Sequence, residues 1–144
     1  MGMQERMGDL VARLKHCRSL GEIQEACSTL GKETDVVPLL TGVLGSEETS
    51  VRWKAAVALT GMGVPAVEKM IGCLSDPRAF VRSSAAWVLG NIGDRRAVSR
   101  LRKSLEDPSP DVRKEASEAL GKLMKGGESQ KEGNGTRAGP VPFS

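Results

Sequence analysis

The chain has 144 residues, a 39% share of apolar residues and a formal net charge of +3, which fit one domain and do not by themselves imply a polyanionic partner. No apolar run reaches the roughly 18 to 20 residues of a membrane-spanning helix, and the first residues lack the apolar core of a signal peptide. The three cysteines have no CxxC spacing, so we expect a reduced, cytoplasmic protein that makes no contact with a membrane.

A capping helix is predicted at the start of the chain. Residues 3–16 place Met7, Leu10, Val11 and Leu14 at helical spacing, which predicts a helix with one apolar face. We interpret residues 3–19 as a cap that covers the end of the first repeat.

Related segments follow the cap, and three of them align on the dipeptide Val-Arg. They read VRWKAAVALTGMG from Val51, VRSSAAWVLGNIG from Val81 and VRKEASEALGKLM from Val112, at steps of 30 and 31 residues. An earlier segment, EIQEACSTLG from Glu22, keeps the alanine, leucine and glycine of the pattern but lacks Val-Arg. Internal similarity at this period is typical of solenoid proteins.

Each complete copy predicts two helices. An apolar stripe at helical spacing follows Val-Arg, and a second stripe follows after a glycine break. Such a hairpin cannot bury both apolar faces alone, so neighbouring hairpins must stack. We therefore predict an all-α domain over residues 1–125. Its predicted parts are the cap, repeats at about 22–50, 51–80 and 81–111, and a half-repeat at 112–125.

The end of the chain has a different composition. Residues 126–144 are rich in glycine and polar residues and offer too few apolar side chains to offset the entropy of ordering them. We expect a disordered, Gly-rich tail, and the sequence leaves open whether it carries a binding motif.

The frame DPxxxVRxxAxxxLGxxGDxxAVxxL, taken from residues 76–105, resembles the HEAT-like repeat of the phycobilisome-lyase type. The resemblance covers about residues 20 to 125. It implies a short right-handed α-α superhelix, a HEAT-like solenoid of about three and a half helical hairpins plus the N-terminal capping helix. It implies little about function, because scaffolds, adaptors and a few enzymes share this repeat.

Asp76 and Arg82, and then Asp107 and Arg113, recur with the same six-residue offset. An acid–base or anion-binding pair is one interpretation. We favour a structural ladder in which each loop carboxylate accepts a fork of N–H bonds from a guanidinium. The resemblance implies the same ladder.

Catalytic residues are not evident. The single histidine, His16, precedes Cys17, but adjacent helical residues point about 100° apart, so we expect an inert pair. The histidine and cysteine spacings fit no zinc site, and we expect no cofactor. The HEAT-like enzymes include deoxyhypusine hydroxylase, a di-iron enzyme whose signature is repeated His-Glu pairs. None occurs here, so we expect that the chain is not this enzyme and is not an enzyme at all.

The second helices of the repeats are the candidate partner-binding surface, because they usually line the concave face of HEAT-like solenoids. Trp53, on a first helix, is a separate candidate, and the candidates on the second helices are Leu39, Lys69, Arg95, Arg96, Arg100, Arg102 and Lys103. The last five form the basic 95–103 cluster, whose internal repulsion an acidic partner would relieve. A solvated helix face is the alternative interpretation.

These features predict a non-catalytic scaffold that binds another protein, such as an acidic segment, on the concave face. An alternative is a protein that binds nucleic acid or another anion through the basic 95–103 cluster, although the chain offers few aromatic side chains for base stacking. A third, implied by the resemblance alone, is a bilin-lyase-like or phycobilisome-turnover subunit. We expect a monomer or a weak homodimer that pairs through a terminal repeat.

Overall fold

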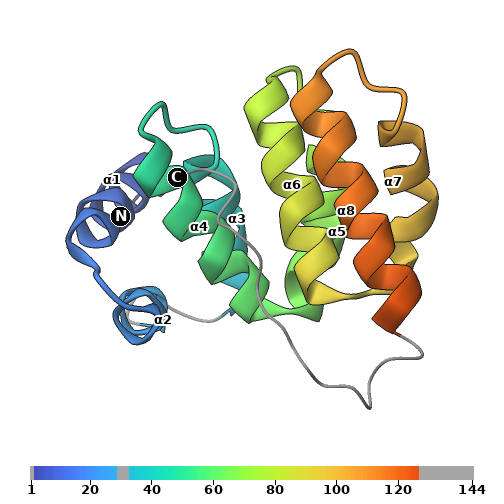
Figure 1. The fold of residues 1–144 in the computed structure, drawn as a ribbon. Helices are drawn as coiled ribbons and strands as arrows, with labels where there is room; N and C mark the ends of the chain where they lie inside the picture. Colours follow the sequence, from blue (N-terminus) through green and yellow to red (C-terminus); the bar gives the residue numbers. More distant parts are fainter. Residues whose placement is uncertain (1, 29–32, 127–144) are drawn as a thin grey trace.

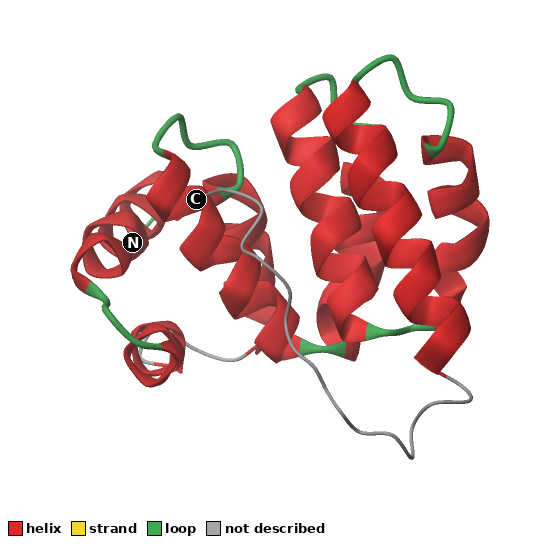
Figure 2. Cartoon of the chain, viewed as in Figure 1, coloured by secondary structure: helices red, strands yellow, loops and turns green. Residues whose placement is uncertain are grey.

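The structure is a computed structural model that describes residues 2–28 and 33–126. These residues form α-helices and one short 3-10 helix, and no strand occurs among them (Figures 1 and 2). The prediction of an all-α solenoid is confirmed. The tail predicted to be disordered lies, beyond Gly126, outside the described residues.

The helices stack as two layers. Helices α4, α6 and α8 make one layer, and α3, α5 and α7 lie behind them in the other (Figure 1). Helices α1 and α2 stand at the N-terminal end of the stack. The elements are α1 (Met3–His16), α2 (Leu20–Ser28), α3 (Glu33–Val43), α4 (Thr49–Met62), α5 (Val64–Cys73), α6 (Ala79–Ile92), η1 (Arg95–Ala97), α7 (Val98–Ser104) and α8 (Pro110–Gly126).

Two glycines turn the chain from one layer to the other. Gly63 (φ 68°) ends α4 and Gly93 (φ 83°) ends α6, and both have the positive φ that residues with a Cβ avoid. Pro65 follows in the first turn of α5, where its missing N–H removes no helical hydrogen bond. Asp94 caps η1 by accepting the backbone N–H of Arg96 at 2.9 Å.

One hydrophobic core runs through the described repeats. Val51, Val81 and Val112, which define the repeat alignment, are buried at the same position of α4, α6 and α8. Among the largest fully buried side chains are Leu10 and Leu14 of α1, Leu40 of α3, Leu59 of α4, Met70 of α5, Leu89 of α6 and Leu101 of α7. None of the helices in the described part of the chain is both long and apolar enough to cross a membrane.

Helix α8 packs closely along α6. A Cβ added to Gly90 would lie 2.7 Å from the Cα and 2.8 Å from the Cβ of Ala119, so only glycine permits this approach of the two backbones. At the other end, the Lys54 ammonium of α4 donates to the carbonyl oxygen of Leu14 at 2.8 Å. A cation at the last carbonyls of α1 is favourable and ties the cap to the stack.

Candidate functional site

The basic 95–103 cluster is partly neutralised. The Arg96 guanidinium donates to both carboxylate oxygens of Asp94, at 2.9 to 3.2 Å, and to Oε2 of Glu68 at 3.2 Å. Arg100 donates to Oγ of Ser75 at 2.6 Å. Two of the five cations are therefore held by groups of the chain itself, which the sequence-based count of charges did not include.

The other cations of the candidate surface are exposed. Arg95, Arg102 and Lys103 lie on η1 and α7, and Lys69 lies on α5. No ion pair joins any of these four to another described residue. They place positive charge on the second layer of the stack.

Leu39 does not belong to a surface. Only 1% of its area is exposed, so its prediction as a partner-binding residue is wrong: the side chain belongs to the core between the layers. Trp53 is half-buried and lines an apolar cavity of about 280 Å³ together with Leu20, Ile23 and Val57. The structure places Trp53 on the first layer, apart from the cations of α5 and α7.

Arg82 joins two consecutive repeats. Its Nη1 donates to the backbone carbonyl oxygen of Asp76 at 2.8 Å, and its Nε and Nη2 donate to the carboxylate of Asp107 at 2.8 and 3.0 Å. The fork therefore reaches the aspartate of the next repeat, and not the carboxylate six residues earlier. The carboxylate of Asp76 accepts from Arg78 at 3.0 and 3.1 Å.

The same in-repeat contact recurs in copies whose side chains differ. Nη1 of Arg52 donates to the carbonyl oxygen of Ser46 at 2.8 Å, and Nη1 of Arg113 donates to that of Asp107 at 2.7 Å. Because the acceptor is a backbone oxygen, serine serves at position 46 as well as aspartate would. Arg52 also lies over the Phe80 ring, 4.5 Å from its centroid.

A groove lies between the end of α1 and helix α2. It encloses about 540 Å³ and is lined by Arg13, His16, Cys17, Glu22, Glu25 and Ala26. Glu22 accepts the backbone N–H of Arg18 at 2.5 Å, whereas the Glu25 carboxylate makes no hydrogen bond or ion pair with the described residues. Two glutamates therefore face this groove, in the part of the chain where residues 1–50 carry five basic and eight acidic side chains, a net charge of −3.

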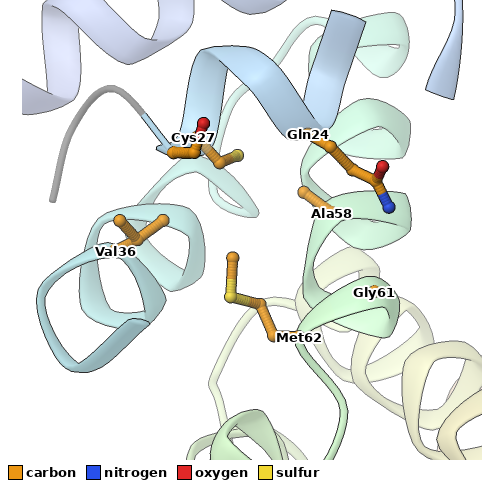
Figure 3. Close-up of a pocket in the computed structure, with 7 residues that line it drawn as sticks. Gln24, Cys27, Val36, Ala58, Gly61 and Met62 are labelled. Carbon is orange, nitrogen blue, oxygen red and sulfur yellow. The ribbon is translucent and has the colours of Figure 1, made fainter. Parts of the chain in front are cut away.

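A smaller cavity of about 190 Å³ lies between α2, α3 and α4 (Figure 3). Met62 reaches from the end of α4 into the space below Cys27, with Val36 and Ala58 on the sides. Burial, with a smaller effect of Cys17, raises the pKa of the Cys27 thiol to about 11. The thiol is therefore neutral at physiological pH and is no nucleophile, so this cavity can hold apolar groups but has no catalytic dyad.

The metal-binding capacity of the chain is low. Its one histidine, His16, lies beside Cys17, whose pKa is raised chiefly by burial, and the sequence contains no His-Glu pair. No group of three or more His, Cys, Asp or Glu side chains within residues 2–28 and 33–126 is placed to hold a metal ion. The residues present do not fit a di-iron centre.

Comparison with known proteins identifies the repeat. The family of HEAT repeats matches residues 8–87 and 67–132. The solved structure of human deoxyhypusine hydroxylase in complex with glycerol is similar with a TM-score of 0.61 and 21% identity, over 98% of this chain and 50% of that chain. At this identity the likeness concerns the fold. The phycobilisome-lyase type of the repeat is not confirmed by these matches.

Two curated relatives have the same name. A deoxyhypusine hydroxylase of Phaeosphaeria nodorum (strain SN15) is 35% identical over 100 residues, which are 60% of this chain and 30% of the relative. A deoxyhypusine hydroxylase of Bos taurus is 37% identical over 75 residues, 50% of this chain and 25% of the relative. The chain thus spans less than a third of the curated relatives it matches.

These relatives overturn the sequence-based prediction of function. The prediction of a non-catalytic scaffold, with its anion-binding and bilin-lyase alternatives, is wrong, because the relatives are enzymes. The exclusion of deoxyhypusine hydroxylase rested on absent His-Glu pairs. The absence of His-Glu pairs bears only on metal ligands. The similarity to these relatives lies in the repeat framework, which a protein can retain without the metal ligands.

Proposed function

The chain belongs to the family of HEAT repeats, and on this premise we propose that it takes part in the hydroxylation of deoxyhypusine as the component that binds the substrate. The observation that carries the proposal is the 35% identity over 100 residues to an enzyme with this activity in its name. The residues present do not fit a di-iron centre, so the proposal concerns the binding of the substrate and not the oxidation step itself. The repeats of this chain supply binding surface.

The groove between α1 and α2 is the surface that suits this substrate best. Deoxyhypusine carries amine groups, and a protonated amine is favoured beside carboxylates. Glu25 and Glu22 line the groove. The Glu25 carboxylate makes no ion pair with a described residue, and Arg13, which lines the same groove, is paired with Asp9. The cation Lys54 is engaged by backbone carbonyls at the end of α1.

A binding assay with the full chain tests the proposal. The probes are a protein that carries deoxyhypusine and the same protein with unmodified lysine at that position. We expect tighter binding of the deoxyhypusine form, and Glu25→Gln should weaken it about threefold at low salt, in the range of exposed ion pairs. Glu118→Gln on α8 is the matched control and should leave the affinity unchanged.

Two results would contradict the proposal. Equal affinity for both probes would refute substrate recognition. Equal weakening by Glu25→Gln and Glu118→Gln would refute the groove between α1 and α2 as the binding surface.

We also infer that the protein functions in the cytoplasm. Its cysteines are free, and Cys17 and Cys27 are buried, as expected in a reducing compartment. Fractionation of cells that produce the tagged chain would test this location.

A further inference from the structure

The contacts of Arg82 define how one repeat holds the next. The first half of its guanidinium, Nη1, is fixed by two carbonyl oxygens of its own loop, those of Asp76 at 2.8 Å and Pro77 at 3.1 Å. The second half, Nε and Nη2, is then aimed outward and binds both carboxylate oxygens of Asp107 in the following loop. This is the bidentate geometry in which arginine recognises carboxylates most strongly.

Arg113 is fixed in the same way, but only its Nη1 finds acceptors among the described residues. Its Nη1 donates to the carbonyl oxygens of Asp107 at 2.7 Å and Pro108 at 3.2 Å. Its Nε and Nη2 have no acceptor among the described residues. The first half of the contact is therefore complete and orients the guanidinium, while no carboxylate within residues 2–28 and 33–126 binds its second half.

The outer face of α8 corresponds in sequence to the face of α6 that packs against α8. Ser117 and Gly121 correspond to Ala86 and Gly90 when the two copies are aligned on Val-Arg. Ala86 and Gly90 are buried, and Gly90 lies directly against Ala119 of α8, whereas Ser117 and Gly121 are exposed and a Cβ added to Gly121 would meet no atom within 4 Å. At Gly90 the adjacent helix fills this space, whereas at Gly121 the same space is open.

We propose that Arg113, Ser117 and Gly121, together called the α8 edge, form a docking surface for a repeat of the same kind carried by another polypeptide. The carboxylate of an Asp-Pro loop of that repeat binds Nε and Nη2 of Arg113, and its following helix crosses α8 at Gly121. The proposal does not depend on the activity proposed above, because it rests on contacts within the stack.

A second copy of this chain is a poor occupant. In a head-to-tail stack its N-terminal end would meet the α8 edge, and the loop ahead of α2 reads Cys17-Arg18-Ser19, with no carboxylate. Arg18 would approach Arg113 with a like charge. Charge complementarity thus favours a partner that brings its own aspartate.

A peptide that copies the interaction inside the fold serves as the probe. Residues 105–124 of this chain contain the loop aspartate and most of the helix that dock on α6, and a side-chain cross-link would keep the peptide helical. We expect the fluorescently labelled peptide to bind the full chain saturably. Arg113→Gln should weaken binding about threefold to tenfold, as loss of a bidentate pair implies.

Three further measurements decide whether the peptide carboxylate and the outer face of α8 are responsible for the binding of the peptide. Asp107→Asn in the peptide should cause the same loss, and combining it with Arg113→Gln should cause no further loss. Gly121→Leu in the chain should block docking by filling the open space. The control Arg102→Gln removes an exposed cation of α7 and should not change the affinity.

The proposal is overturned if the peptide fails to bind, or if it binds wild type and Arg113→Gln equally. It is also overturned if sedimentation shows that the wild-type chain alone dimerises and that Arg113→Gln abolishes the dimer, because the occupant is then a second copy. The peptide variant keeps the test valid if the substitution at Arg113 disturbs folding.

Discussion

At the scale of single residues, Asp107 is the loop carboxylate that binds an arginine of the preceding repeat. It accepts two N–H bonds from Arg82 and one from the backbone of Ser109 at 2.9 Å. The side chains of Arg82 and Asp107 are only 15% and 10% exposed, so solvent screens their attraction weakly. The pair connects two repeats through one contact.

Asp107→Asn should lower the free energy of unfolding by about 1 to 3 kcal/mol near pH 7, because the fork loses its charged acceptor. The hydrogen bonds from Arg82 are the main cause that holds the pKa of Asp107 below its ordinary value. Between the two pKa values the unfolded chain binds more protons, so this stabilisation is present above about pH 4 and is lost as pH falls through the folded value.

Urea unfolding at several pH values measures this difference. Asp111→Asn, at an exposed residue of the first turn of α8, is the control and should have a much smaller effect. If Asp107→Asn were as stable as wild type near pH 7, the pair between the repeats would have no role in stability.

Glu115 should show the opposite dependence on pH. Only 8% of this residue is exposed, and burial is the main cause that raises the pKa of its carboxyl, with Glu118 as the next. Lys114 and Lys122 act in the other direction. Because the folded state holds the proton more strongly, the stability that Glu115 allows is greatest below its ordinary pKa of about 4.3 and falls as pH rises above it.

Glu115→Gln should therefore stabilise the fold near pH 7 and have little effect near pH 4. Thermal unfolding at both pH values measures the two differences. A variant that is destabilised near pH 7 would mean that the carboxylate is favourable where it lies, contrary to its burial.

At the scale of elements, close packing of α6 on α8 depends on one glycine. Gly90→Ala places a Cβ 2.7 Å from the Cα of Ala119, so the helices must separate or tilt, which typically costs about 1 to 3 kcal/mol. Gly121→Ala, at the equivalent position of α8, meets no atom and should stabilise by up to about 1 kcal/mol through helix propensity. Chemical denaturation of both variants should give opposite signs, and equal signs would contradict this packing.

The elements themselves could be predicted from the sequence, because apolar spacing and turn glycines are local signals. Gly63 and Gly93 end their helices as the pattern predicted, and the valines of the three Val-Arg pairs are buried. Contacts between repeats could not be predicted in this way. Spacing within one copy paired Arg82 with Asp76, whereas the fork reaches Asp107, which is 25 residues away.

The same limit applies to the candidate surface. Leu39 was placed on a face by periodicity, but the neighbouring helices that bury it do not appear in its local sequence. Arg96 looked like a free cation, yet Glu68, which pairs with it, lies 28 residues earlier on another helix. The groove beside His16 was missed because its glutamates belong to α2, and only the fold brings them to the end of α1.

At the scale of the whole molecule, a solenoid is held together by contacts between neighbours, so its stability can differ from one end to the other. Helix α6 lies between α4 and α8 and contacts α5 in the second layer, and its contact with α8 is the most extensive in the described stack. Helix α2 stands at the N-terminal end and contacts only α1 and α4 extensively. Amide hydrogen exchange should therefore be slower in α6 than in α2.

Gly90→Ala extends this comparison, because it loosens the best-packed contact without touching the N-terminal end. Exchange in α6 and α8 should accelerate, while exchange in α1 and α2 should change little, since those helices depend on α3 and α4. Mass spectrometry of exchanged peptides measures each helix separately. Equal acceleration in all helices would mean that the chain opens as one cooperative unit, and the nearest-neighbour description of this stack would then be wrong.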